Sequence, residues 1–253
     1  MNRRITIKIL ALDIETLYLT AGVWGVWGVN VGLEQLFDNG KVLCWAAKWI
    51  GKRDMFYGEH RDLDFLQRIH ALLDEADAVL TYNGKRFDVP MLNREFLKAG
   101  MSPPSPYKQI DLLETMKKQF KFPSNKLQHV SSELGIGSKT KHEGFSLWTK
   151  CEAGDPKAWE LMERYNKQDV RLLEKLYNKT KAWTVGHPNQ NTHGKNGVCP
   201  VCGGKHLQSR GTYKTATGIY PRFQCVSCGK WSRGRFTLVE KTIRPNILVE
   251  AAI

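Results

Sequence analysis

The sequence lacks any segment that would anchor it in a membrane. None of its apolar runs reaches the roughly 18 residues that a membrane-spanning helix needs. The nearest candidate, residues 21–31, is short and rich in glycine. We do not expect the apolar segment after Arg3 and Arg4 to be a secretion signal, because it runs into Asp13 and Glu15 without a small-residue cleavage site. We therefore expect a cytoplasmic protein that binds no membrane.

Acidic residues are almost missing from the last quarter of the chain. From Thr184 onward there are ten Lys and Arg residues but only two acidic ones, Glu240 and Glu250. This segment carries +8 of the net charge of +13, whereas the first 183 residues, with 28 basic and 23 acidic residues, carry +5. A basic excess in so short a segment indicates a polyanionic partner such as nucleic acid.

Cysteine is scarce, and its distribution is uneven. Cys44 and Cys151 stand alone, and we expect them to be inert. The other four form two C-x-x-C-G motifs with 22 residues between them: Cys199, Cys202, Cys225 and Cys228. Four thiolates spaced in this way can surround one tetrahedral ion, and a glycine after each second cysteine lets the backbone curl round the sulfurs. The motifs predict one structural Zn²⁺ in a reducing compartment, with a rubredoxin-type iron centre as the alternative.

The pattern of apolar residues predicts an α/β domain over residues 1–183. Strands are expected at 5–12, 42–50, 54–57 and 78–81, and helices at 63–73, 89–99, 112–120, 127–134 and 159–180. The polar stretch 184–197, with Pro188, Gly194 and Gly197, predicts a linker. Residues 198–253 then form a second, small domain that holds the paired cysteines.

Two carboxylates lie at the end of the first predicted strand. Asp13 and Glu15 are two residues apart, so they share one face of the strand. Such a pair repels unless a cation lies between the two groups, and Mg²⁺ and Mn²⁺ are the ions that take carboxylate ligands of this kind. Taken alone, the pair could also be an exposed acidic strand end.

Two further acidic motifs follow along the chain. Asp88 stands where a strand leads into a helix, in the sequence N-G-K-R-F-D, and a helix N-cap is the ordinary interpretation there. Tyr165 and Asp169 are four residues apart on a predicted helix and therefore share a face. In isolation this second pair could be a surface tyrosine beside a solvated carboxylate.

Together, the D-x-E strand, the N-x-x-x-F-D junction and the Y-x-x-x-D helix resemble the three motifs of the DEDD exonuclease superfamily over residues 5–180. Tyr165 is typical of the DEDDy branch, since the other branch would carry histidine where this chain has Arg164. The resemblance is closest to stand-alone exonuclease-like domains of bacteria and phages. It implies a ribonuclease H-like mixed sheet flanked by helices and a 3′–5′ exonuclease in a bacterial or phage-infected cell, acting on DNA or RNA with a free 3′ end.

The resemblance also implies a role for each motif residue. Two Mg²⁺ or Mn²⁺ ions would be held by four carboxylates, with Asp13 between them: Asp13, Glu15, Asp88 and Asp169. Two such ions, about 3.5–4 Å apart, activate a water molecule and stabilise the leaving oxygen. Tyr165 would orient the attacking water. A structure-selective endonuclease of the same fold and a non-catalytic nucleic-acid-binding protein are the alternatives, although binding alone gains nothing from clustered negative charge.

Three other features near these motifs have two interpretations each. We expect Asp111 to cap a helix at 112 rather than to serve as a fifth acidic ligand. Lys139 and Lys141 lie in a basic loop that either holds the substrate backbone or is simply solvated. Trp24 and Trp27 could stack on a terminal base, but we expect them to pack in the core.

The segment with the paired cysteines resembles the zinc ribbons of transposases and transcription factors. Basic residues alternate with aromatic ones along its predicted hairpin, a pattern that suits phosphate neutralisation together with base stacking. The candidate nucleic-acid contacts are Arg210, Tyr213, Lys214, Arg222, Trp231 and Arg233. The alternative is a ribbon whose aromatic residues pack a small core and which binds a protein partner.

Overall fold

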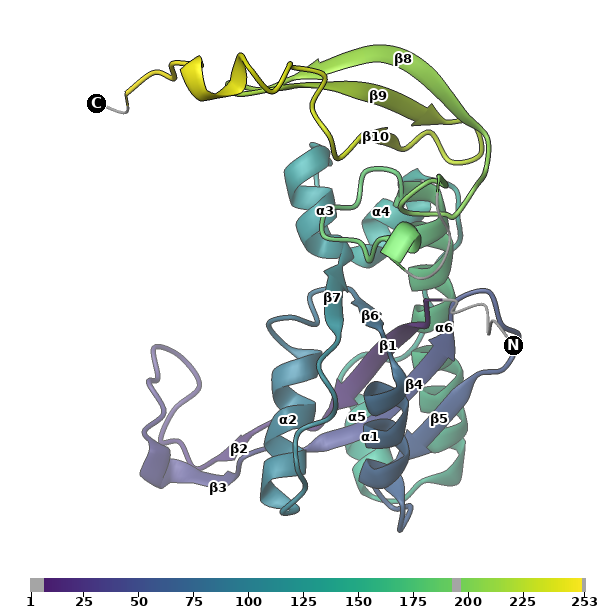
Figure 1. The fold of residues 1–253 in the computed structure, drawn as a ribbon. Helices are drawn as coiled ribbons and strands as arrows, with labels where there is room; N and C mark the ends of the chain where they lie inside the picture. The colour runs from purple at the N-terminus through teal and green to yellow at the C-terminus, as the bar shows by residue number, and fades with distance from the viewer. Residues whose placement is uncertain (1–6, 193–196, 252–253) are drawn as a thin grey trace. The chain divides into compact units, whose positions relative to one another are not determined.

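A five-stranded mixed sheet runs through the unit formed by Lys8–Asn178 (Figure 1). In the computed structural model, which describes residues 7–192 and 197–251, the strand order is β5 (Phe56–Glu59), β4 (Val42–Trp49), β1 (Ile9–Thr16), β6 (Ala78–Thr81) and β7 (Lys108–Asp111). β1 pairs with β4 in antiparallel fashion and with β6 in parallel fashion. The central strand is therefore the one that carries Asp13 and Glu15.

Helices cover both faces of this sheet. On one face, α1 (Phe65–Glu75) and α2 (Asp88–Lys98) pack against Leu10, Leu12 and Ile14 of β1. On the other face, α5 (Ser146–Glu152) and α6 (Pro156–Thr180) form a second apolar cluster, while α3 (Leu112–Gln119) and α4 (Leu127–Glu133) follow β7. Because side chains alternate along a strand, Asp13 and Glu15 lie on the side of α6. The predicted ribonuclease H-like architecture is confirmed.

The structure corrects several predicted boundaries. The first strand does not end at residue 12: β1 continues to Thr16, because its pairing with β4 extends that far. Residues 5 and 6 of the predicted strand lie outside the described residues. Four elements were missed: β2 (Thr20–Ala21), β3 (Leu36–Asp38), β7 and α5. Each has only two to seven residues and offers little periodicity to detect. None of the described helices is both long and apolar enough to cross a membrane.

A hairpin between β1 and β4 projects from the sheet (Figure 1). It consists of β2 (Thr20–Ala21), the 3₁₀ turn Leu33–Gln35 and β3 (Leu36–Asp38). The side chains of Trp24 and Trp27 in its loop are 104% and 90% exposed. The expectation that they pack in the core is wrong, because the loop leaves the sheet instead of folding back over an apolar surface.

The described residues from Lys179 onward belong to a second unit. Its antiparallel sheet has the order β10 (Trp231–Arg233), β9 (Ile219–Cys225) and β8 (Leu207–Lys214). Two 3₁₀ turns, Gln190–Thr192 and Arg244–Asn246, flank it in the sequence. The apolar cluster that its described residues form is small and includes all four paired cysteines, two of them buried and two partly buried. A core of this size indicates that something besides apolar burial stabilises the unit.

Gly58 lies directly across the sheet from Trp45, and this pair gives a test of the fold. A Cβ atom at position 58 would come within 2.6 Å of the Trp45 ring. That ring is buried and donates a hydrogen bond from Nε1 to the Phe65 carbonyl at 3.1 Å, so it has little freedom to move. We expect Gly58→Ala to lower the free energy of unfolding by about 1–3 kcal/mol.

Denaturant unfolding followed by tryptophan fluorescence measures this effect. The matched control is Gly25→Ala in the exposed hairpin loop, where a new Cβ meets no atom within 4 Å and the backbone φ is not positive. The control should unfold at the wild-type denaturant concentration. Equal midpoints for both variants would contradict the close packing of Trp45 against β5.

Candidate active site and metal centre

Three carboxylates converge on the α6 side of the sheet. Oxygen atoms of Asp13, Glu15 and Asp169 all lie within 4.8 Å of one another. Burial, and next the charge of Asp169, raise the pKa of Asp13 well above its usual value, and the same two causes raise the pKa of Glu15 to about 8. Carboxylates this close together, one buried and two half-buried, are unfavourable without a compensating cation.

The contacts of Asp169 test whether a divalent cation fits this cluster. One of its oxygens, Oδ2, forms an ion pair with the ammonium group of Lys139. The other, Oδ1, is buried and has no hydrogen-bond partner among the described residues. A buried acceptor without a partner, inside a set of oxygen ligands, is what a hard divalent cation would satisfy. The donor set therefore fits Mg²⁺ or Mn²⁺.

Asp88 lies next to this cluster rather than inside it. It is the first residue of α2, so the predicted N-cap position belongs to Phe87 instead. Its Oδ1 accepts a hydrogen bond from the backbone N–H of Ile14 at 3.1 Å. Burial raises the pKa of Asp88 to about 7, although this hydrogen bond opposes the shift. The charge of Asp88 in turn raises the pKa of Asp13, so the two carboxylates interact.

Hydrogen bonds to Asp111 stabilise the turn that precedes Asp88. As expected, it caps α3, and its Oδ1 accepts the N–H of Leu113 at 2.9 Å. The same oxygen accepts the N–H of Asn83 at 2.8 Å. Asn83 has φ 72°, a left-handed conformation that asparagine tolerates better than most residues. Asp111 thus positions the strand-to-helix junction.

Tyr165 and Lys139 adjoin the carboxylates. The Lys139 ammonium donates to the Tyr165 hydroxyl at 3.2 Å as well as pairing with Asp169. Burial, followed by the charges of Glu15 and Asp169, raises the pKa of Tyr165, so its phenol stays protonated at neutral pH. Burial alone would lower the pKa of Lys139, but Asp169 raises it. Lys141, the other basic residue of the predicted pair, is exposed.

Two contacts of this site were missed from the sequence. The side chain of Asn166 is fully buried and donates from Nδ2 to Asp13 Oδ2 at 2.7 Å and to the Asp13 carbonyl at 3.2 Å. The rings of His142 and Trp148 meet the Tyr165 ring edge-on, with centroids 4.8 and 6.1 Å away. The only sequence signal for Asn166 was its position inside the Y-N-K-Q-D motif. That position lies on the face of the helix that packs against the strand carrying Asp13.

An open groove of about 840 Å³ extends from the carboxylates past α3 and α4. Asp13, Lys139 and Tyr165 lie on its wall, together with Lys117 and Lys126 from α3 and the residue before α4. Cationic side chains on the wall would counter the charge of a phosphate backbone.

The four paired cysteines form a second candidate metal centre. Their sulfurs all lie within 4.8 Å of one another, and the Cys199–Cys228 and Cys202–Cys225 Sγ–Sγ distances are both 3.6 Å. A tetrahedral site with Zn–S bonds of about 2.3 Å requires sulfurs about 3.8 Å apart. In each knuckle the glycine after the second cysteine donates its N–H to the carbonyl of the first, at 3.0 and 2.9 Å. The cluster is therefore consistent with a small zinc ribbon.

The six predicted nucleic-acid contacts of this segment all lie on its sheet. Three are on β8, one on β9 and two on β10: Arg210, Tyr213, Lys214, Arg222, Trp231 and Arg233. The register of the strands decides which of them share a face.

Comparison with known proteins supports the fold. The family model of the RNase H superfamily matches residues 46–181, a span that includes Asp88, Tyr165 and Asp169 but begins after Glu15. No curated protein matches the sequence. Among solved structures, the family B DNA polymerase from the hyperthermophilic archaeon Pyrobaculum calidifontis is similar, with a TM-score of 0.54 and 18% identity over 70% of this chain. The match covers only 25% of the polymerase chain. At this low identity, the likeness shows a shared fold.

Proposed function

The chain belongs to the RNase H superfamily, a group of nucleases, and from this we propose that it is a metal-dependent 3′–5′ exonuclease of the DEDDy type. The observation that carries the proposal is the convergence of Asp13, Glu15 and Asp169 beside the hydroxyl of Tyr165, with one buried oxygen of Asp169 left without a partner. Lys139 pairs directly with Asp169 alone, so the charges of Asp13 and Glu15 would still need a cation to offset their repulsion.

Asp13, Glu15 and Asp169, with Asp88 beside Asp13, would hold two divalent ions. When bound, such ions acidify water and neutralise the charge that develops on a phosphodiester. The rest of the arrangement orients these ligands. Asn166 fixes one oxygen of Asp13, and the backbone N–H of Ile14 fixes one oxygen of Asp88.

Tyr165 and Lys139 would act on the substrate from the groove. A protonated phenol can donate a hydrogen bond to a phosphate oxygen or accept one from the attacking water, but it is a poor general base. Lys139 keeps the hydroxyl in place at 3.2 Å, and its positive charge faces the path of the substrate backbone. We assign it to binding the phosphate next to the cleaved bond.

We propose further that the zinc ribbon assists nucleic-acid binding. Residues 207–233 contain five Lys and Arg residues and no acidic residue. A cationic surface of this kind increases affinity for any phosphate backbone without reading its sequence. A protein-binding ribbon is the alternative that the same residues leave open.

A digestion time course tests the exonuclease proposal. The substrates are 5′-labelled linear DNA and RNA of matched sequence and a circular single strand, incubated with Mg²⁺ or Mn²⁺. We expect the linear strands to shorten progressively from the 3′ end and the circle to stay intact. Cleavage of the circle at a similar rate would establish an endonuclease instead, and no cleavage of any substrate would establish a binding protein.

The Tyr165 hydroxyl gives a sharper prediction. Tyr165→Phe should keep substrate affinity but slow cleavage by about 10- to 1,000-fold, somewhat less than the loss of a general acid or base, because the phenol only orients the reacting groups. The ring would still pack against His142 and Trp148, so the fold should not change. Turnover and Kd are measured on the same labelled strand. Tyr107→Phe, a half-buried tyrosine packed against the α1–α2 core, is the matched control and should cleave normally. Wild-type turnover in Tyr165→Phe would mean that this tyrosine is structural.

A further inference from the structure

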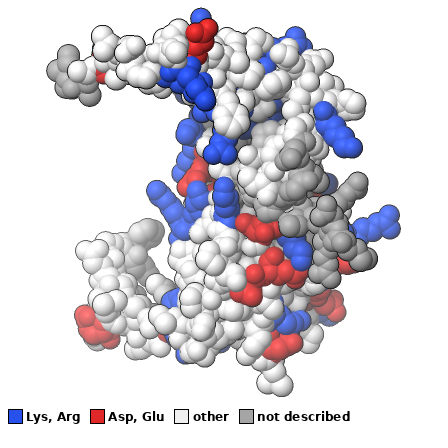
Figure 2. Space-filling model, viewed as in Figure 1, with Lys and Arg blue, Asp and Glu red and all other residues white. Residues whose placement is uncertain are grey.

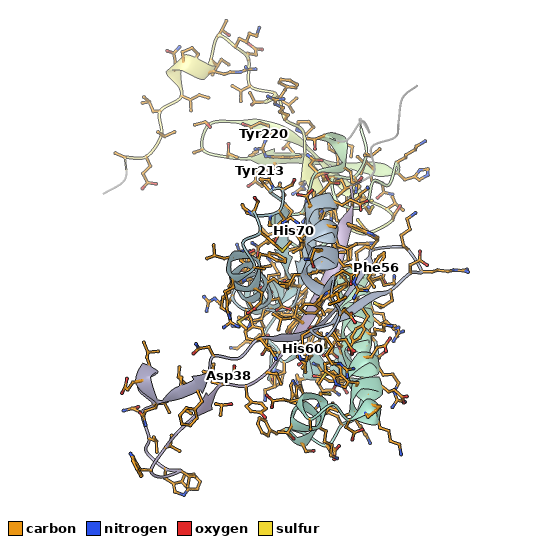
Figure 3. The ribbon with its side chains drawn as sticks, turned by 90° about the horizontal axis from the view of Figure 1, so that it is seen from below. Asp38, Phe56, His60, His70, Tyr213 and Tyr220 are labelled. Carbon is orange, nitrogen blue, oxygen red and sulfur yellow. The ribbon has the colours of Figure 1, made fainter. Side chains whose placement is uncertain are left out.

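One face of the C-terminal sheet combines aromatic rings with arginines. Directly paired residues lie on the same face of an antiparallel sheet, and the pairs here are Tyr213 with Tyr220 and Arg222 with Arg233. Trp231 is paired with Gln224, which shares its face with Tyr220 and Arg222 because side chains alternate along β9. We call this surface the aromatic–arginine face: Tyr213, Tyr220, Arg222, Trp231 and Arg233. Figure 3 labels Tyr213 and Tyr220 on their neighbouring strands.

The arginines of this face hold the rings in place. The Arg233 guanidinium lies 4.0 Å from the centre of the Tyr220 ring and 5.9 Å from that of Tyr213. The Arg222 guanidinium lies 5.0 Å from the centre of the Trp231 ring, and its Nε donates to the Arg210 carbonyl at 2.9 Å. Cation–π contacts of this kind limit the rotation of rings that would otherwise be free at a surface. A ligand would therefore meet rings that are already ordered.

The rings remain accessible despite these contacts. Tyr213 is 47% exposed and Trp231 is 48% exposed. On the side shown in Figure 2, this unit presents more Lys and Arg atoms than Asp and Glu atoms. The strands and turns over 207–233 carry five positive charges and no negative one. The partner that complements such a face is a polyanion that also offers flat apolar surfaces.

Unpaired nucleic acid has both properties. Its phosphates complement the arginines, and its bases can stack on aromatic rings. In a duplex the base faces are already covered by their neighbours, so a duplex would use only the positive charges. An acidic peptide would likewise use the charges and leave most of the ring surface uncovered.

We infer that the aromatic–arginine face is a binding site for single-stranded nucleic acid, with Trp231 and Tyr213 stacking on unpaired bases and Arg222 and Arg233 contacting phosphates. The inference rests on the proposed function, in which the ribbon contacts nucleic acid. It adds the class of strand that the ribbon binds and the residues that select this class.

Fluorescence anisotropy with the full chain tests whether the aromatic–arginine face prefers single-stranded nucleic acid. Ca²⁺ replaces Mg²⁺ to suppress cleavage. The probes are a labelled single-stranded oligonucleotide, an abasic strand of the same length and a duplex of the same sequence. Trp231→Leu and Tyr213→Leu should each weaken binding of the normal single strand about 5- to 50-fold, in line with the stacking energy of one base. The same variants should bind the abasic strand and the duplex as the wild type does.

Lys214→Gln is the matched control, because Lys214 is next to Tyr213 on β8 and therefore points to the opposite face. Because it lies away from the bound strand, its loss should change the affinity for all three probes by the same small factor. The leucine variants should leave the slope of log affinity against log salt unchanged, since they remove no charge. Trp231→Phe, which keeps an aromatic ring, should retain most of the affinity that Trp231→Leu loses, and zinc content of one ion per chain checks that each variant is folded.

Two results would overturn the inference. If the leucine variants weaken binding of the abasic strand as much as that of the normal strand, the rings only support the sheet. If they change no affinity at all, the face serves another partner. The nuclease proposal is tested separately by cleavage of linear strands. Ring-independent binding with intact cleavage would refute only this inference, and ring-dependent binding without cleavage would refute only the nuclease.

Discussion

Replacing Asp13 or Asp169 with asparagine is expected to lower cleavage by several orders of magnitude while the protein stays folded. Each residue contributes an oxygen to the three-carboxylate cluster, and each buried charge there repels the others. Replacing Asp13 relieves that repulsion, so the thermal stability of this variant without divalent ions should be unchanged or higher. Replacing Asp169 also breaks its ion pair with Lys139, so that variant should melt at a lower temperature. The same change weakens the ligand set for a divalent cation, on which hydrolysis would depend. Asp88→Asn should act in the same direction, because Asp88 interacts with Asp13.

Two measurements on each variant separate catalysis from folding. Turnover is followed on a labelled linear strand, and the melting temperature is recorded with and without Mg²⁺ or Mn²⁺. The wild type should be stabilised by the ion, since a ligand that binds only the native state raises its stability. The variants should lose that response. Asp54→Asn, an identical change on an exposed turn, should behave as the wild type does. Near-normal cleavage by any two of the cluster variants would refute the two-metal assignment.

The acidic motifs could be predicted because each depends on a local period. Alternation along β1 places Asp13 and Glu15 on one face, and a four-residue spacing on α6 places Tyr165 beside Asp169. Lys139 and Asn166 could not be assigned in this way, because their contacts join residues 30 and 153 positions apart in the sequence. Only the packing of α6, and of the loop between α4 and α5, near β1 brings these side chains to the carboxylates.

In the second unit, too, features set by local sequence could be predicted, whereas features set by strand pairing could not. The two C-x-x-C-G knuckles repeat one backbone hydrogen-bond pattern, so their spacing was enough to predict a metal centre. The face that carries Tyr213 was not predictable by alternation. A bulge between Ser209 and Thr212, where Gly211 has φ 73°, shifts the register of β8. Strict alternation along β8, without a bulge, would place Tyr213 on the face of Ser209 rather than on that of Tyr220.

Folding of the ribbon should depend on the metal that its four cysteines would hold. The buried apolar cluster around the cysteines contains only Cys199, Val201 and Cys225, with three partly buried neighbours. Apolar burial on this scale cannot offset the entropy of ordering three strands, whereas structural zinc contributes about 10–16 kcal/mol in small zinc domains. Replacing all four cysteines with serine should therefore remove the zinc, from one ion per chain to none, and unfold the ribbon.

The consequence for substrate binding follows from the charges that the folded ribbon presents. Each phosphate that a protein neutralises contributes about 0.9 to the slope of log affinity against log salt on duplex DNA, and about 0.7 on single strands. Losing three or four ordered contacts should flatten this slope by about two to four units and weaken binding most visibly as salt rises. Turnover at saturating substrate should stay near normal, because Asp13, Glu15, Asp88, Tyr165 and Asp169 all belong to the other unit.

Equilibrium binding of a labelled oligonucleotide across a salt series, with Ca²⁺ in place of Mg²⁺, measures this effect. Substitution is preferable to chelation, since a chelator would also remove ions from the carboxylate cluster. Ser227→Ala is the matched control: it changes an exposed residue of the second knuckle but keeps all four thiols, so zinc content and salt slope should be those of the wild type. The quadruple variant could lose its zinc and yet keep the wild-type affinity for the oligonucleotide and the wild-type salt slope. In that case the ribbon does not bind nucleic acid and binds a protein partner instead.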